Sequence, residues 1–447
     1  MNSRRILPFV VATLVFASVF SALAQPTAGP AVRPAAMASP TVIVVPPEAQ
    51  PSAHFDADAA TSAYLAQIPP AAKARSDAYF EGGYWLILWD FLYGIVVAII
   101  LLNFRWSAFM RDRAEKITRF KPIQTFLYWL QYVVVTFVLG FPLAWYEGLF
   151  REQKYGLATQ TFGPWMGDEM KALMVNVIMG GIVLMLLFGV ARRLTRTWHI
   201  WGALVTMLFL VFAQLIAPIF IFPLFNKITR LNDPKVTVPI LSMARANGIP
   251  VKDVFQIDAS KQTTRMSANV SGFGNTMRIT LNDNLLRRGS SEEIQAVMGH
   301  EMGHYVLNHV YKGMLFFLVV IVTSFIVLRW SLDWSLARWG EKWQIRGIGD
   351  TAILPLVFLL LGIFFFILTP IMNTDTRTSE QEADMYGLNA SRQPDGFAQA
   401  AIHLAEYRKM SPGPIEEWIF YDHPSGRHRI NAAMRWKGEN LKLFTRP

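Results

Sequence analysis

The sequence predicts a mainly α-helical bundle of membrane-spanning helices that carries a small soluble α+β insert. Hydrophobic residues make up 53% of the 447 residues and charged residues only 17%, a composition typical of membrane proteins. Six runs are long and apolar enough to cross a bilayer, which requires about 20 residues each. Between the fourth and fifth runs, polar and apolar residues alternate as they do in short strands and amphipathic helices.

The amino terminus predicts a bacterial-type secretory signal over residues 1–24. Arg4 and Arg5 form a basic start, residues 6–20 an apolar core, and residues 22–24 a small-residue cleavage site. The alternative is an uncleaved first membrane helix, and in both cases the following segment is exported. Residues 25–75 are rich in Pro and Ala, so we expect a disordered or loosely extended linker there.

The predicted membrane helices fall into two groups, four within residues 76–225 and two within residues 313–373. Tryptophan and tyrosine residues gather at several of their ends, as they do at bilayer interfaces. The six apolar runs lie near residues 84–104, 126–146, 172–190, 200–222, 314–332 and 352–372.

Two loops between these runs are rich in Lys and Arg, namely residues 105–121 and 192–196. The positive-inside rule places both in the cytoplasm of a multi-pass protein of the bacterial inner membrane. Residues 226–310 and the tail after Asn373 then face the periplasm or the cell exterior. The net charge of +10 could suggest nucleic acid, but much of it lies in these loops, so we predict no nucleic-acid partner.

The soluble insert, residues 226–312, is predicted to contain a helix, three strands and a second helix. The first helix covers residues 233–248, and the strands lie near 254–257, 267–271 and 277–281, with Gly272, Gly274 and Asn275 at the turn. Ser290 and Glu293 fit a capping box, so the second helix is expected to run from about Ser291 to Val310. A hairpin therefore leads into this amphipathic helix.

Two histidines in the second helix have the spacing of metal ligands. His300 and His304 are four residues apart and leave the same helix face, so one Zn²⁺ ion could lie between their rings. Glu301 would reach the metal-bound water and act as a general base for hydrolysis. A chance His-x-x-x-His on a core helix is the alternative.

A catalytic zinc site needs a third protein ligand, and the chain contains no cysteine. The best carboxylate candidate is Glu380, in the predicted carboxy-terminal helical segment 374–447. Helical spacing places Asp384 on the same face, where it could orient a histidine, and turns Glu382 away. A solvated acidic helix start is the alternative.

These motifs, taken in order, resemble the M48 membrane metalloendopeptidases, and more narrowly the CAAX prenyl protease 1 branch. The resemblance spans roughly residues 80–435. It rests on His300-Glu301-x-x-His304 with Asn308-His309, Arg377-x-x-Glu380-x-x-Ala383-Asp384, residues 147–157, residues 223–227, Ser267-Ala268-Asn269, and His423-Pro424 with Arg429.

The resemblance implies one zinc ion per chain, held by His300, His304 and Glu380, with Glu301 activating water. It also implies that Ala268 and Asn269 lie on an edge strand that pairs with an extended peptide substrate. By the same resemblance, His423 and Arg429 would contact the substrate or stabilise the oxyanion.

Members of this branch enclose a large wet chamber within a ring of membrane helices. Asp90 and Gln131 lie inside predicted membrane runs, so the resemblance makes them candidate wall residues of such a chamber. Hydrogen bonding between helices is the alternative role for both.

Eukaryotic members have seven spanning helices and process prenylated CAAX peptides that face the cytosol. This chain has six predicted helices, a signal sequence and an exported catalytic side. We therefore expect its partners to be membrane lipid and exported or membrane-associated peptides, with a prenylated substrate as the alternative.

Two other functions are alternatives to a zinc endopeptidase. An intramembrane protease would place the His-Glu motif in an apolar run, and the polar segment Glu292–Gln295 argues against this. A non-catalytic scaffold or transporter with a structural zinc would need a closed site, which usually has four protein ligands rather than three.

Overall fold

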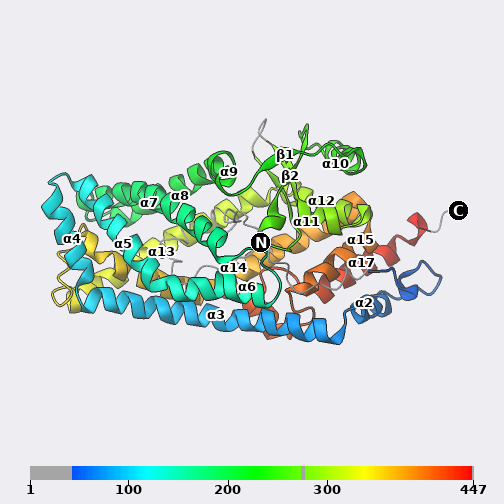
Figure 1. Ribbon diagram of the computed structural model, residues 1–447, viewed down its shortest axis with the longest axis horizontal. Coiled ribbons are helices and arrows are strands. Elements are labelled where there is room, and N and C mark those ends of the chain that lie inside the picture. The colour runs from blue at the N-terminus through cyan, green and yellow to red at the C-terminus, as the bar shows by residue number, and fades with distance from the viewer. Residues whose placement is uncertain (1–42, 273–276, 445–447) are drawn as a thin grey trace.

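The computed structural model describes residues 43–272 and 277–444, so the predicted signal sequence lies outside the described residues. Long helices run side by side along the length of the molecule, and a smaller mixed α/β part covers one end of them (Figure 1). Short helix α4 (Trp106–Ile117) crosses the other end.

Six helices of the described chain are long and apolar enough to span a membrane, as predicted. They are α3 (Pro70–Asn103), α5 (Lys121–Trp145), α7 (Phe162–Arg193), α8 (Trp198–Ile216), α13 (His309–Trp339) and α14 (Leu354–Ser391). Helices α5 and α8 continue through π-helical turns, Tyr146–Phe150 and Ala217–Ile221, into α6 (Arg151–Lys154) and α9 (Phe222–Phe225). This is a multi-pass membrane protein.

Helix α14 extends well beyond the bilayer. Its 38 residues correspond to about 57 Å, whereas the hydrocarbon core is about 30 Å thick. The apolar half of the helix packs among the other membrane helices, and the polar half, which contains Glu380 and Asp384, projects into the α/β part. One continuous helix thus connects the membrane bundle to the predicted metal site.

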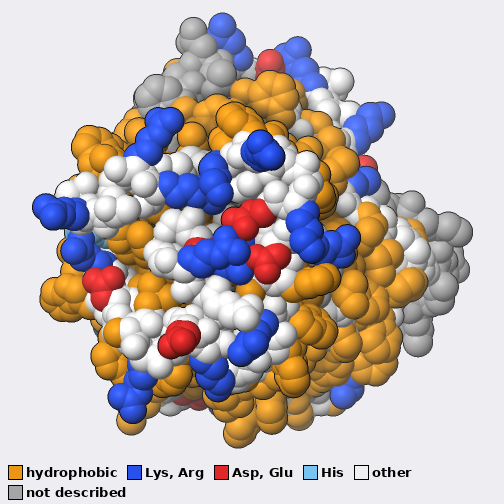
Figure 2. Space-filling model, turned by 90° about the vertical axis from the view of Figure 1, so that its left-hand side faces the viewer, with side chains coloured by type: hydrophobic (Ala, Val, Ile, Leu, Met, Phe, Trp, Pro, Cys, Tyr) orange, Lys and Arg blue, Asp and Glu red, His pale blue; other side chains and the backbone are white. Residues whose placement is uncertain are grey.

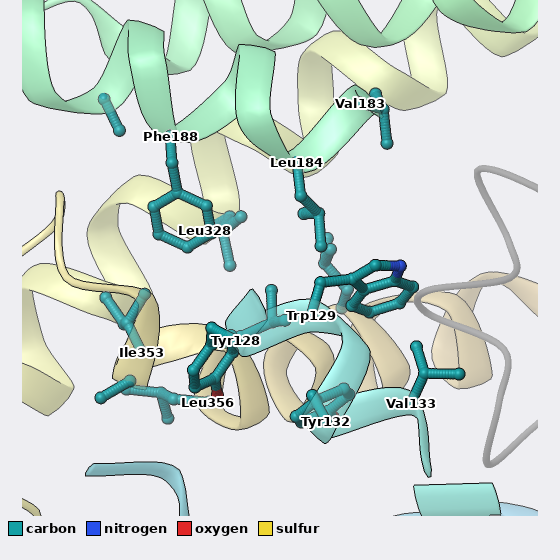
Figure 3. Packing of buried hydrophobic residues seen from close by; sticks show 14 of the residues in the cluster. Tyr128, Trp129, Tyr132, Val133, Val183, Leu184, Phe188, Leu328, Ile353 and Leu356 are labelled. Atoms are coloured by element: carbon teal, nitrogen blue, oxygen red, sulfur yellow. The ribbon is translucent and has the colours of Figure 1, made fainter. Parts of the chain in front are cut away.

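Aromatic and aliphatic side chains from all six membrane helices fill much of the membrane bundle. Figure 3 shows Trp129 of α5 and Phe188 of α7 among the side chains of this core. Glycines allow close packing here, since a Cβ on Gly180 would lie 2.5 Å from the Trp129 ring. A cavity among these helices is lined almost entirely by apolar residues, with Thr206 and Ser324 as exceptions.

The residues expected to line a wet chamber are not among those that line this apolar cavity. Asp90 is buried on α3. Gln131 instead donates hydrogen bonds to the carbonyl oxygens of Met110 and Leu127. The amide of Gln131 thus joins α5 to α4, which is the alternative role of hydrogen bonding between helices.

The end of the bundle at α4 is rich in Lys and Arg, which Figure 2 shows spread over a face bordered by apolar flanks. The predicted basic loop is mostly helical, because α4 occupies most of it. Arg111 of α4 is buried and forms an ion pair of 2.6 Å with Asp350, just before α14. This ion pair holds α4 against the segment that leads into α14.

The predicted linker is wrong for its described part, which is folded. Residues 47–49 form a 3-10 turn and α2 covers Ala57–Ala66. Tyr64 of α2 is fully buried, and its hydroxyl donates to Asp395 of α15 (Pro394–His403) at 2.8 Å. Residues 70–75 already belong to α3. The Ala-rich composition suggested disorder, but small residues here allow close packing.

The soluble insert contains a four-stranded sheet in the order β1-β2-β4-β3. The three predicted strands are present, and β1 was not predicted. Strands β3 and β4 pair antiparallel, as a hairpin requires, and the turn residues Gly274 and Asn275 lie outside the described residues. The strands are β1 (Ile228–Arg230), β2 (Val254–Ile257), β3 (Ala268–Ser271) and β4 (Arg278–Asn282), with α10 (Pro234–Ala246) and α11 (Asp283–Arg288) beside them.

Helix α12 (Ser291–Val306) begins at the predicted capping box. The Glu293 backbone N–H donates to Ser290 Oγ, and the Ser290 N–H donates to Glu293 Oε2. The helix ends four residues earlier than predicted, because Asn308 adopts a left-handed conformation (φ 59°) and α13 starts at His309. The chain therefore turns sharply between the metal motif and the next membrane helix.

Candidate active site

Helices α12 and α14 cross so closely that no side chain fits between them at the crossing. A Cβ added to Gly387 would lie 2.6 Å from the backbone nitrogen of His300, and one added to Gly299 would lie 2.8 Å from the Gly387 oxygen. This close approach brings the polar half of α14 directly over the two histidines of α12.

The three predicted metal ligands converge at this crossing. One ligand atom from each of His300, His304 and Glu380 lies within 4.8 Å of the others. The two Nε2 atoms are 3.1 Å apart, and they lie 3.2 Å and 3.6 Å from the two oxygens of Glu380. Atoms about 2.1 Å from one tetrahedral ion lie about 3.4 Å from each other, so this donor set fits a zinc ion.

The outer nitrogen of His300 is held by a buried carboxylate. Its Nδ1 lies 2.7 Å from Asp384 Oδ1, the contact expected of a carboxylate that orients a histidine. Arg429 of α17 (Gly426–Glu439) donates to both oxygens of Asp384 through its Nε and Nη2 atoms. The structure thus places Arg429 behind His300, against Asp384.

The outer nitrogen of His304 has a different partner, which the sequence reasoning missed. His304 Nδ1 lies 2.9 Å from Nδ1 of His309, and His309 Nε2 lies 3.0 Å from Glu382. Lys312 donates to the same carboxylate at 2.7 Å. Glu382 does point away from Glu380 on α14, but it reaches the metal motif through His309.

The pKa values of the two histidines differ because their surroundings differ. Burial, together with the charge of the nearby His300, lowers the pKa of His304 to about 4. Burial also lowers the pKa of His300, but its hydrogen bonds to Asp384 and Glu380 outweigh this and raise the pKa to about 10. Since an imidazole binds metal through an unprotonated nitrogen, a metal ion bound here would displace a proton from His300.

Glu301 occupies the position expected for a general base, one residue after the first histidine. Burial raises the pKa of Glu301 to about 7, and the charge of nearby His300 only partly opposes this rise. A carboxylate with a pKa near neutrality can both accept and return a proton at physiological pH. Its chemistry therefore suits hydrolysis.

His423 approaches the same centre from the loop between α16 (Pro414–Phe420) and α17. Its Nε2 lies 3.2 Å from Glu380 Oε2, and its Nδ1 lies 2.9 Å from Asp422. The structure therefore brings this side chain to the centre, where Nε2 could donate a hydrogen bond to a bound group.

The other predicted substrate residues lie on β3. This strand is at the sheet edge and pairs with β4, with Ala268 opposite Leu281 and Asn269 opposite Thr280. Asn269 is exposed, and β3 packs against the helix that carries the histidines. The strand therefore offers an edge beside the metal motif.

A buried ion pair anchors the chain just before β3. Arg265 donates to Glu152 of α6 at 2.8 Å and to the hydroxyl of Tyr79 on α3 at 2.7 Å. Glu152 belongs to the stretch 147–157 that helped to carry the family resemblance. That stretch thus ties the membrane helices to the start of the edge strand.

Comparisons with known proteins agree with this architecture. The model for peptidase family M48 matches residues 230–437. The model described as "CAAX prenyl protease N-terminal, five membrane helices" matches residues 57–227, a range in which the described chain has four candidate spans. Together the two matches cover the membrane bundle and the site.

Individual relatives fit the same pattern. The chain is 28% identical to the uncharacterized metalloprotease YhfN of Bacillus subtilis over 321 residues, which are 71% of this chain and 75% of that protein. It is 28% identical to CAAX prenyl protease 1 of Saccharomyces cerevisiae over 312 residues, 66% of this chain and 68% of that one. A crystal structure of S. mikatae Ste24p has the same fold, with a TM-score of 0.70 at 24% identity over 82% of this chain and 89% of the other.

Proposed function

The chain belongs to the M48 peptidase family, and we propose that this membrane metalloprotease cleaves extended peptides with one zinc ion held by His300, His304 and Glu380. The recognition of the family from sequence motifs is confirmed. The observation that carries the proposal is the tetrahedral spacing of three ligand atoms, with the outer nitrogen of each histidine hydrogen-bonded to a further side chain.

In this proposal several side chains around the centre each have a role in hydrolysis. Zinc, when bound, would supply a Lewis acid that polarises the scissile carbonyl and acidifies water. Glu301 accepts a proton from the attacking water and returns it to the leaving amine. His423 donates from Nε2 to the developing oxyanion, and Arg429 holds the carboxylate that orients His300.

The free edge of β3 would hold the peptide. An extended chain can add to a sheet edge through backbone hydrogen bonds, which select for conformation rather than for a particular sequence. Ala268 and Asn269 lie on this strand, and the exposed side chain of Asn269 is free to contact the peptide. The scissile bond would then lie beside α12.

We infer that the substrates are exported or membrane-associated peptides of a bacterial inner membrane. The basic end of the bundle would face the cytoplasm, and α12, which carries the two histidines, lies toward the end opposite α4 (Figure 1). Helix α12 is not among the six candidate spans of the described chain, which argues against a zinc ion in the bilayer core. A reporter fused after Lys227 and active only in the cytoplasm would contradict this orientation.

Metal content and substrates can be tested together. The purified protein should contain one zinc ion per chain, lose peptide cleavage on chelation and regain it with added zinc. Proteomics of membranes carrying wild type or Glu301→Gln should show exported or membrane proteins accumulating with the variant. Accumulation of prenylated carboxy-terminal peptides instead would favour the substrate class named in the CAAX prenyl protease relatives.

A further inference from the structure

A groove lies on the outside of the membrane bundle, between α4 and α5. On α5, Leu130 and Val134 are 38% and 46% exposed, whereas Trp129 and Val133 are buried in the bundle core. The groove therefore opens away from the core. Its lining consists of Trp106, Phe109, Met110 and Arg113 of α4 and Leu130, Gln131, Val134 and Val135 of α5.

The surroundings of this groove restrict what can occupy it. Helix α5 is a candidate membrane span, so its outward face meets hydrocarbon chains and not water. Helix α4 crosses the basic end of the bundle, which places its residues at the level of lipid headgroups. The one amide in the lining, that of Gln131, is already hydrogen-bonded to backbone oxygens, so the floor of the groove is apolar.

The charges of α4 are arranged so that one cation remains available at the groove. Both carboxylates of the helix are already paired, since Asp112 and Glu115 each bind Arg346 at 3.0 Å and 2.8 Å. Among the described residues, no carboxylate lies within ion-pair distance of Arg113. Its guanidinium lies over the Phe109 ring, 5.7 Å from the centroid.

We propose that this groove binds one anionic glycerophospholipid, with its phosphate on Arg113 and an acyl chain along the apolar floor. A guanidinium presents two parallel donors that match phosphate oxygens. Lys116 and Arg119 also lack a carboxylate partner within the described part of the chain, and their charge favours an anionic over a zwitterionic headgroup. A two-fold contact with a second copy through this surface would instead bring like charges together.

Native mass spectrometry of the full chain in detergent tests this site. The protein is titrated with dioleoyl phosphatidylglycerol or with dioleoyl phosphatidylcholine, which has the same acyl chains. We expect one phosphatidylglycerol to bind at least about fivefold more tightly, as charge-assisted hydrogen bonds predict. Arg113→Gln should reduce this preference, and Val134→Trp should weaken binding of both lipids by filling the groove.

Matched controls separate the site from general effects. Arg193→Gln removes one exposed cation at the end of α7, and Val138→Trp adds the same bulk one turn further along α5, outside the lining. Both should bind as wild type does. Equal affinity for the two lipids, or an unchanged preference in Arg113→Gln, would overturn the proposal in favour of non-specific annular lipid. A dimer that Val134→Trp dissociates would assign the groove to a second copy instead.

Discussion

The two histidines of α12 leave the same helix face one turn apart, yet their supports differ. His300 is held by Asp384, whose side chain is 3% exposed and is itself bound by Arg429. His304 is held through His309 by Glu382, whose side chain is 45% exposed. A broken buried pair leaves an uncompensated charge, whereas an exposed pair contributes little. We infer that the buried partners of His300 determine the position of the metal ligands. Changes to the exposed partner of His304 should matter less.

Asp384→Asn should have the largest effect of the substitutions that probe this comparison. It leaves Arg429 buried without its carboxylate, so we expect a loss of about 3–5 kcal/mol in the free energy of unfolding. Zinc affinity should fall about 10–100-fold, because His300 loses the partner that orients it. Denaturation and chelator competition in detergent measure the two quantities. Asp422→Asn, which changes a more exposed carboxylate, is the control. Wild-type stability in Asp384→Asn would refute the buried-pair argument.

His309→Phe should have an intermediate effect. The ring keeps its approximate volume but can no longer accept a hydrogen bond from His304 or donate one to Glu382. We expect zinc affinity to fall about tenfold, at the lower end of the range for a lost partner of a metal ligand. Chelator competition measures this affinity. An unchanged zinc affinity would show that His309 does not support the ligand His304.

Another histidine–carboxylate pair, which does not touch the predicted metal ligands, predicts a pH effect on stability. Glu293 lies 3.0 Å from His403, and both side chains are largely buried. Burial raises the pKa of Glu293, but hydrogen bonds from His403 and the Ser290 N–H outweigh it and leave the pKa below its usual value.

Because the folded pKa of Glu293 is depressed, its contribution to stability is present above the unfolded value and is lost as the pH falls below it. The melting temperature of wild type should therefore fall between about pH 5 and pH 3 more steeply than that of Glu293→Gln. Parallel curves for the two proteins would rule out this contribution.

Glu382→Gln should have the smallest effect. An exposed carboxylate beside Lys312 contributes less than about 1 kcal/mol, and the amide oxygen can still accept from His309. Stability should stay within about 0.5 kcal/mol of wild type and zinc affinity within about threefold. A loss as large as that of Asp384→Asn would show that the two histidines depend equally on their partners.

Much of the fold could be predicted because its causes are local in the sequence. A bilayer requires long apolar runs, and these located the six membrane helices. Ser290 and Glu293 located the start of α12 through a capping box that needs only neighbouring residues. The end of α12 was missed, because the left-handed Asn308 leaves no periodic signal.

The remaining errors concern contacts between distant segments. Residues 43–68 seemed to be a linker by composition, and only packing against α15 and α17 explains their folding. At the site, helical spacing located Glu380 and Asp384 on one face of α14. Spacing within one helix could not reveal that Glu382 meets His309 on another.

The central claim is that Glu301 activates water at a zinc ion held by its neighbours. The most direct measurement compares zinc content and peptide cleavage in purified wild type and Glu301→Gln. The account predicts that the variant keeps one zinc ion per chain and loses cleavage by at least about 100-fold, because general-base catalysis contributes 10²–10⁴-fold. Undiminished cleavage by a zinc-loaded Glu301→Gln protein would contradict it.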